Sequence, residues 1–198
     1  MVHNDVLRSI RYALDLSEPK LIELIHRVDP AFAIDRDAVR ALLLKEDEPG
    51  HLPCSDAVLA RFLDGLIVDR RGRDEGRPQR PFETRVSNNL VLKKLRIAFE
   101  LTDLDMLALF DAAGFAVSKS ELSALFRQPD HRNYRPCGDQ MLRNFLKGLS
   151  ARLREVPAGA AERRPADVWV RPQAAAAPDR KATPAPAATT RKRNTPRR

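Results

Sequence analysis

The chain has 198 residues, of which 43% are hydrophobic and only 6% aromatic. Its apolar residues suffice for a core, while the scarcity of aromatic residues argues against a β-sandwich or barrel, and the abundant Leu, Ala and Arg favour helices. The longest apolar runs, such as residues 41–44, are far shorter than the roughly 20 residues of a membrane span. The N-terminal residues also lack the pattern of a secretion signal. We therefore expect a cytoplasmic protein that does not enter a membrane and whose two cysteines are free thiols.

The net charge of +8 is unevenly distributed. Residues 155–198 contain ten Lys or Arg against four Asp or Glu, whereas residues 1–154 contain 25 against 23. A basic balance points to nucleic acid or another anionic partner. Here it points chiefly to the C-terminal segment.

An internal repeat is the most informative feature of the sequence. One set of residues recurs at an offset of 85, namely Asn4, Leu7, Arg11, Ala13, Leu16 and Leu24 as Asn89, Leu92, Arg96, Ala98, Leu101 and Leu109. A second set recurs at an offset of 83, in the pattern Pro-Cys-x-Asp-x-x-Leu-x-x-Phe-Leu-x-Gly-Leu that begins at Pro53 and again at Pro136. The chain therefore contains two copies of one domain of about 70 residues.

Each copy predicts four short helices. In the first copy, apolar residues at helical spacing follow Asn4 and Asp5, either of which is placed to cap the first helix. Ser17 begins the second helix, the third spans about 35–45, and Ser55 caps the fourth. The second copy repeats this plan, with starts at Thr102, Ser118 and the pair Gly138-Asp139.

The composition between and after the copies is different. Residues 70–85 are rich in Arg, Gly and Pro, which predicts a hydrated linker, and residues 155–198 are rich in Ala, Pro and Arg, which predicts a disordered basic tail. Trp169, the one tryptophan, lies in this tail. It could anchor a partner, or it could pack back on the surface of the chain's own domain. We predict an all-α protein with repeats at 1–69 and 86–154 separated by the linker and followed by the tail.

Three segments resemble a known family. They are the pattern Asn-Asn-x-Val-Leu-Lys-Lys-Leu-Arg-Ile-Ala-Phe at 88–99, the turn Lys-Glu-Asp at 45–47, and Cys-Gly-Asp-Gln-x-Leu-Arg-Asn-Phe-Leu at 137–146. They are similar to the YehS-like family of uncharacterised bacterial proteins, over roughly residues 1 to 152. The resemblance implies a tandem helical protein with one domain of unknown function present twice, and it does not indicate which activity the protein has.

Ten residues form the signature shared by the repeats: Asp47, Cys54, Asp56, Phe62, Gly65, Asp130, Cys137, Asp139, Phe145 and Gly148. A cysteine at a helix start is either a reactive thiolate or, as we favour, a small buried side chain. The aspartates of the fourth helix suit its dipole, and Asp47 and Asp130 fit an Asx-type loop bond better than a catalytic or cation-binding role. The paired glycines indicate a close helix contact, within a copy or between the two fourth helices.

No catalytic motif is evident, and the cysteines with His51 and His131 lack the close pairs that zinc favours. We therefore expect no metal and no other cofactor, and an enzyme is the least favoured class. A non-catalytic binding protein for RNA or DNA comes first, and a protein-protein interaction module using the groove between the repeats comes second. The candidate phosphate-binding residues are Arg8, Arg11, Arg70, Arg71, Lys93, Lys94, Arg96, Arg191, Lys192, Arg193, Arg197 and Arg198.

Overall fold

The computed structural model describes residues 1–73, 76 and 81–154. These residues form eight α-helices and no strand, which confirms the all-α prediction. The helices are α1 (His3–Leu14), α2 (Glu18–Val28), α3 (Arg36–Leu43), α4 (Asp56–Arg71), α5 (Asn88–Ala98), α6 (Asp103–Ala112), α7 (Lys119–Leu125) and α8 (Asp139–Arg154). None of these helices is long and apolar enough to span a membrane. The tail at 155–198, with Trp169, lies outside the described residues.

The order of helices is the same in both halves, so α1–α4 form the first repeat and α5–α8 the second. Four of the predicted caps are present. The side chains of Ser17, Ser55, Thr102 and Ser118 each accept a hydrogen bond from a backbone N–H in the first turn of α2, α4, α6 and α7. These bonds satisfy backbone donors that a helix leaves free, which is why the helices begin where the sequence predicts.

The predicted cap of the first helix is wrong. Helix α1 begins at His3, and Val2 occupies the cap position without a side-chain bond. Asn4 lies inside the first turn and is only 4% exposed. Its amide is directed into the repeat, where it bonds the backbone of a distant loop, and is therefore not available to cap α1.

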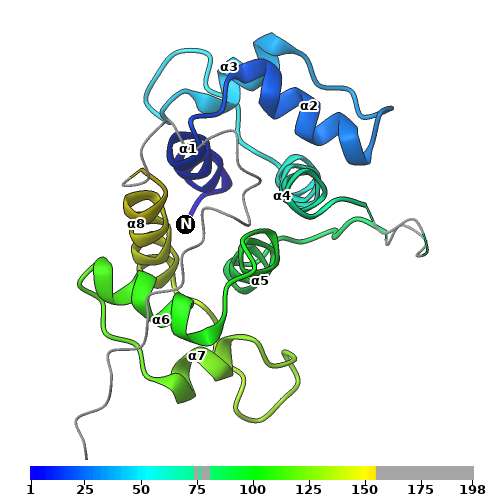
Figure 1. Cartoon of the computed structure of the whole chain (residues 1–198). Helices are drawn as coiled ribbons and strands as arrows, with labels where there is room; N and C mark the ends of the chain where they lie inside the picture. The colour runs from blue at the N-terminus through cyan, green and yellow to red at the C-terminus, as the bar shows by residue number, and fades with distance from the viewer. Residues whose placement is uncertain (74–75, 77–80, 155–198) are drawn as a thin grey trace, which may run out of the picture.

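The two repeats pack reciprocally. Within each repeat, α2 packs on α4 and α6 on α8, but α1 packs mainly against α8 and α4 packs extensively against α5. Figure 1 shows the result, with α1, α4, α5 and α8 between the α2–α3 pair on one side and the α6–α7 pair on the other. The first helix of each repeat is thus covered by the fourth helix of the other.

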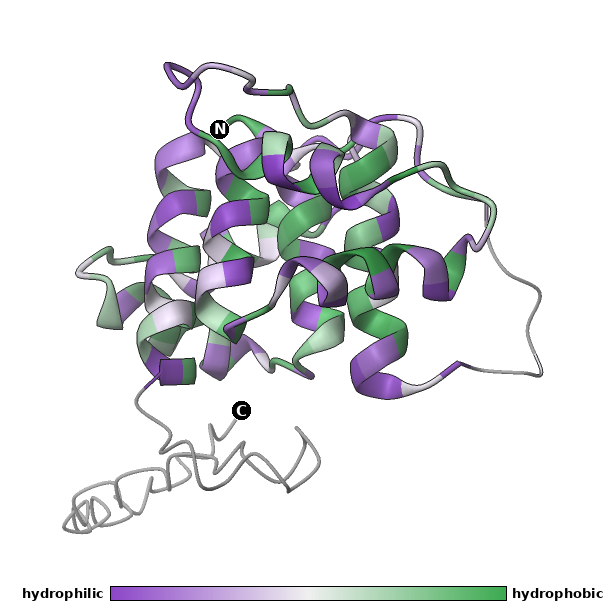
Figure 2. Cartoon of the chain, turned by 90° about the horizontal axis from the view of Figure 1, so that it is seen from above, coloured by the Kyte–Doolittle hydropathy of each residue, from purple (hydrophilic) through white to green (hydrophobic). Residues whose placement is uncertain are grey.

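One continuous core runs through both repeats. Its largest fully buried side chains include Phe62, Phe110 and Phe145, and the hydrophobic parts of the helices face inward in Figure 2. Helix α4 buries residues around much of its circumference because it has partners in α2 and α5. The interface between the repeats is therefore filled with side chains.

The expected linker is partly structured at both ends. Helix α4 continues to Arg71, and Val86 is buried at 7% exposure before α5 begins. The guanidinium of Arg61 lies 4.4 Å from the ring centroid of Phe82 and 4.2 Å from that of Phe32. Phe82, near the end of this stretch, and Val86, the residue that follows it, hold the segment against the folded part.

Candidate functional site

Asn4 and Asn89 fix the loop before the fourth helix of their own repeats. Nδ2 of Asn4 donates to the carbonyls of Leu42 and Leu52, at 2.9 and 2.8 Å, and its Oδ1 accepts the N–H of Cys54 at 2.8 Å. Asn89 makes the same three bonds at the equivalent positions, with Leu125, Arg135 and Cys137. The repeated asparagine therefore fixes the loop before the fourth helix, a structural role that we did not predict from the sequence.

The repeated cysteines are free and buried, with Cys54 8% exposed and Cys137 6% exposed. Burial, and secondarily the carboxylate of Asp56, raises the pKa of Cys54 to about 12. Burial and Asp139 raise the pKa of Cys137 to about 11. Burial thus outweighs the helix N-terminus, which alone would favour a thiolate. These environments support a packing role for both cysteines.

The repeated aspartates of the fourth helices join the two repeats. Oδ1 of Asp56 accepts the backbone N–H of Val86 at 2.6 Å. In the pseudo-equivalent arrangement, the carboxylate of Asp139 pairs with the amino group of Met1. Asp139 also accepts Nδ2 of Asn88 at 2.8 Å, and these two partners hold its pKa below the usual value. Each aspartate therefore secures the residue that precedes the first helix of the other repeat.

The loop aspartates have no comparable role. Asp47 and Asp130 are exposed, and in the part of the chain that the structure describes neither carboxylate makes a hydrogen bond or ion pair. In the first repeat the loop bond that we expected from Asp47 is made by Glu48, whose Oε2 accepts the N–H of Lys45 at 2.6 Å. The expected Asx bonds are therefore absent among the described residues.

The paired glycines mark a contact within each repeat. A Cβ on Gly65 would lie 1.9 Å from the backbone oxygen of Leu24, and a Cβ on Gly148 would lie 1.9 Å from that of Leu109. No side chain fits at that separation, so glycine lets α4 approach α2 and lets α8 approach α6. Phe62 and Phe145, from the same signature, are both fully buried in the core.

Three of the candidate phosphate-binding residues are occupied by contacts inside the protein. Lys94 is 8% exposed and pairs with Asp64 across α4 and α5. The guanidinium of Arg70 lies 4.2 Å from the ring centroid of Phe99, and burial lowers its pKa to about 10. Arg8 donates to the Leu44 carbonyl and pairs with Asp5. Lys94 and Arg70 thus contribute to the interface between the repeats.

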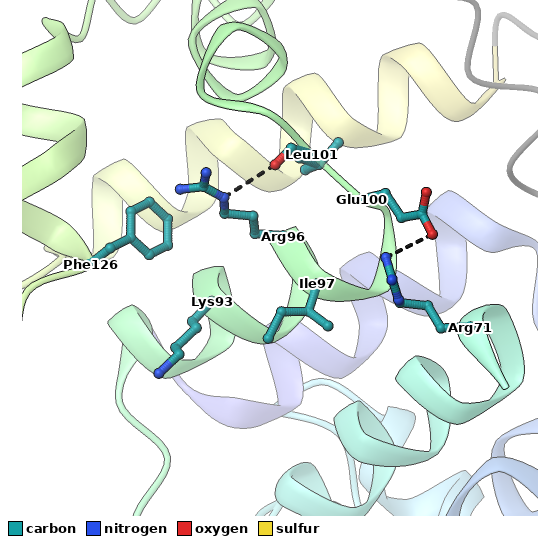
Figure 3. Close-up of a pocket in the computed structure, with 7 residues that line it drawn as sticks. All are labelled: Arg71, Lys93, Arg96, Ile97, Glu100, Leu101 and Phe126. Atoms are coloured by element: carbon teal, nitrogen blue, oxygen red, sulfur yellow. Dashed lines mark hydrogen bonds and ion pairs between the residues drawn. The ribbon is translucent and has the colours of Figure 1, made fainter. Parts of the chain in front are cut away.

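Three others converge on one shallow groove of about 460 Å³, the α5 groove. It is lined by Arg71, Lys93, Arg96, Ile97, Glu100, Leu101 and Phe126. Figure 3 shows Ile97 between Arg71 and Glu100 on one side and Arg96 and Phe126 on the other. Arg11 lies at the equivalent place in the first repeat, and the tail candidates Arg191, Lys192, Arg193, Arg197 and Arg198 lie outside the described residues.

The cations of the α5 groove differ in their partners. Arg71 pairs with Glu100 at 2.7 Å, and Arg96 pairs with Asp103 at 2.8 Å and donates to the Leu101 carbonyl at 3.2 Å. Lys93 is exposed and makes no hydrogen bond or ion pair with any described residue. Exposed ion pairs contribute about 0–1 kcal/mol, so an incoming anion can compete for both arginines.

The apolar part of the groove was not identified from the sequence. Ile97 is 41% exposed although it follows a helical apolar pattern, and Phe126 supports the guanidinium of Arg96 at 4.9 Å from its ring centroid. Tyr12, at the position equivalent to Ile97, is 59% exposed. The sequence shows only that both positions carry a large apolar or aromatic side chain, and their exposure is evident from the structure.

The two repeats carry opposite net charges. Residues 3–71 contain ten Lys or Arg against thirteen Asp or Glu, while residues 88–154 contain eleven against seven. The α5 groove is built mainly from the basic repeat, with Arg71 added from α4. No group of three or more His, Cys, Asp or Glu side chains suited to a metal ion occurs among the described residues.

Comparison with known proteins divides the chain into the same two repeats. A family described as "Protein of unknown function (DUF1456)" matches residues 3–72 and again residues 88–155. The chain is 47% identical over 152 residues to "Uncharacterized protein YehS" of Escherichia coli (strain K12), a match that covers 77% of this chain and 96% of the relative. No solved structure matches the chain. The chain therefore belongs to the DUF1456 family.

Proposed function

We propose that this chain is a non-catalytic binding protein that contacts the phosphates of nucleic acid without reading base sequence. The observation that carries the proposal is the convergence of Arg71, Lys93 and Arg96 on one groove, with Lys93 exposed and unpaired among the described residues. Lys and Arg bind phosphate oxygens irrespective of the base, and each contact releases counterions. The basic sequence of residues 155–198 adds charge of the same sign.

The proposal is tested by fluorescence anisotropy with unrelated oligonucleotides over a range of salt concentrations. Replacing Lys93 by Ala should weaken binding alike for all sequences and reduce the slope of log K against log salt by about 0.7 to 0.9 per lost phosphate contact. Lys147→Ala is the matched control, because Lys147 is also exposed but lies on α8, away from the groove. Removal of residues 155–198 measures how much of the affinity and of the salt dependence comes from the tail.

A partner protein is the second candidate, because the large apolar side chain of Leu104 is 66% exposed on α6. The space between the repeats is filled with side chains. Such a partner would therefore use the α5 groove, which lies at the edge of that interface. If the full chain shows no salt-dependent binding to DNA or RNA at low ionic strength, the nucleic-acid proposal fails and the protein partner becomes the better explanation.

A further inference from the structure

The α5 groove combines cations with exposed apolar surface, and this combination distinguishes between forms of nucleic acid. Ile97 is 41% exposed and Phe126 is partly exposed, whereas Leu101, which also lines the groove, is only 4% exposed. A duplex keeps its bases stacked inside and offers mainly phosphates and polar base edges. A single strand also offers the flat faces of its bases, which pack on aromatic and apolar side chains.

The shape of the groove also disfavours a duplex. Proteins that read duplex DNA usually project a helix into its major groove. Helix α5 is instead flanked at Ile97 by Arg71 from α4 on one side and by Phe126, after α7, on the other (Figure 3). The groove is shallow and has a volume of about 460 Å³, which gives an unstacked base with its sugar room to lie on it without being enclosed.

The equivalent place in the first repeat is a natural internal control. There Arg8 and Arg11 correspond to Lys93 and Arg96, and Tyr12 corresponds to Ile97. The guanidinium of Arg154 lies 3.9 Å from the ring centroid of Tyr12 and donates to its carbonyl at 3.0 Å. In the α5 groove the equivalent arginine, Arg71, pairs with Glu100 instead. Tyr12 is 59% exposed and Ile97 41%, so the two places differ in the arginine that lies over the Tyr12 ring and not in burial.

We propose that the α5 groove binds single-stranded nucleic acid in preference to duplex, with a base against Ile97 beside the stacked pair of Arg96 and Phe126, and neighbouring phosphates on Lys93 and Arg96. This inference rests on the proposed function and specifies its ligand. The charge of residues 155–198 attracts both forms of nucleic acid, so the preference for single strands comes from the apolar surface of the groove.

The test uses the full chain with an unstructured oligonucleotide and with the same sequence as a duplex, at one ionic strength. Ile97→Glu should weaken single-strand binding about tenfold and reduce the ratio of single-strand to duplex affinity, because it removes the apolar contact that only a single strand uses. The added carboxylate repels the phosphates of both forms, so the ratio and not the affinity alone is the readout. Tyr12→Glu, at the equivalent position of the other repeat, should change that ratio by less than about twofold, because the guanidinium of Arg154 already lies over the Tyr12 ring. Both side chains are exposed, and thermal melting checks that both variants are folded.

The outcomes separate the two proposals. Salt-dependent binding with equal affinity for single strand and duplex, or an affinity ratio unchanged by Ile97→Glu, overturns the single-strand inference and leaves the proposed function standing. Absence of binding to either form at low ionic strength overturns both. A loss of about tenfold for the single strand with a smaller loss for the duplex, seen for Ile97→Glu and not for Tyr12→Glu, supports the inference.

Discussion

The two repeats share the residues that build the fold and differ in the residues that meet solvent. Both keep an asparagine that bonds the loop before the fourth helix, a glycine at the closest helix contact, and an aspartate that secures the start of the other repeat. Their net charges have opposite signs, and the α5 groove belongs mainly to the basic repeat. Identity between the copies therefore marks structure at these positions, although the identical pair Asp47 and Asp130 is exposed, and divergence indicates where to look for function.

The largest effect is expected where the two repeats are most alike, at the paired glycines. Gly65→Leu and Gly148→Leu should each destabilise the fold by about 3 kcal/mol, because a Cβ would collide with a backbone oxygen and force two helices apart. Urea denaturation of both variants measures this. A normal midpoint for either one would show that the repeats do not share this contact.

The asparagines should show a smaller and unequal effect. Asn4→Ala leaves the Cys54 N–H and two carbonyls without partners and should cost about 2–3 kcal/mol. Asn89→Ala removes the same bonds but should cost about 1–2 kcal/mol, because Asn89 is only partly buried and water can replace some of them. Equal losses measured by chemical denaturation would contradict this dependence on burial.

Lys94 and Lys147 test which lysines belong to the interface between the repeats. Lys94→Ala should cost about 1–2 kcal/mol, since it leaves Asp64 in a partly buried position without its partner. Lys147→Ala, at an exposed position, should change stability by less than about 0.5 kcal/mol. Thermal melting of the two variants provides the comparison, and an unaffected Lys94→Ala protein would show that the pair is not needed.

The cysteines should behave alike and react little. With pKa values of about 12 for Cys54 and about 11 for Cys137, both thiols are protonated in the folded protein at pH 8. A thiol-specific reagent should therefore label neither cysteine until the chain is denatured, when both should react. Rapid labelling of one native thiol would reveal a reactive site in that repeat.

The fold could be predicted because the same pattern of helices occurs in both copies of the repeat. The helix order and the caps at Ser17, Ser55, Thr102 and Ser118 follow from spacing and local hydrogen bonding. The reciprocal packing of α1 with α8 could not be derived, because periodicity shows which face of a helix is buried but not which helix covers it. The role of Asn4 was missed for a similar reason, since its partners Leu42 and Leu52 are distant in sequence.

The candidate site was only partly accessible from the sequence. Positive charge identified Lys93 and Arg96, but it also identified Lys94, which differs from Lys93 by one position and is buried. Neighbouring residues on a helix point about 100° apart, so their roles depend on the covering helix rather than on residue type. Phe126 joins the groove from a segment about thirty residues further along the chain.

The most direct test is an NMR titration of the full chain with an unstructured single-stranded oligonucleotide at low salt. We expect shifts of the backbone amide signals of Lys93, Ile97 and Leu101 and of Phe126, which line the α5 groove, and smaller shifts at the equivalent positions of the first repeat. Shifts confined to residues 8–16 or 155–198, or no shifts at all, would contradict the assignment of this groove as the binding surface.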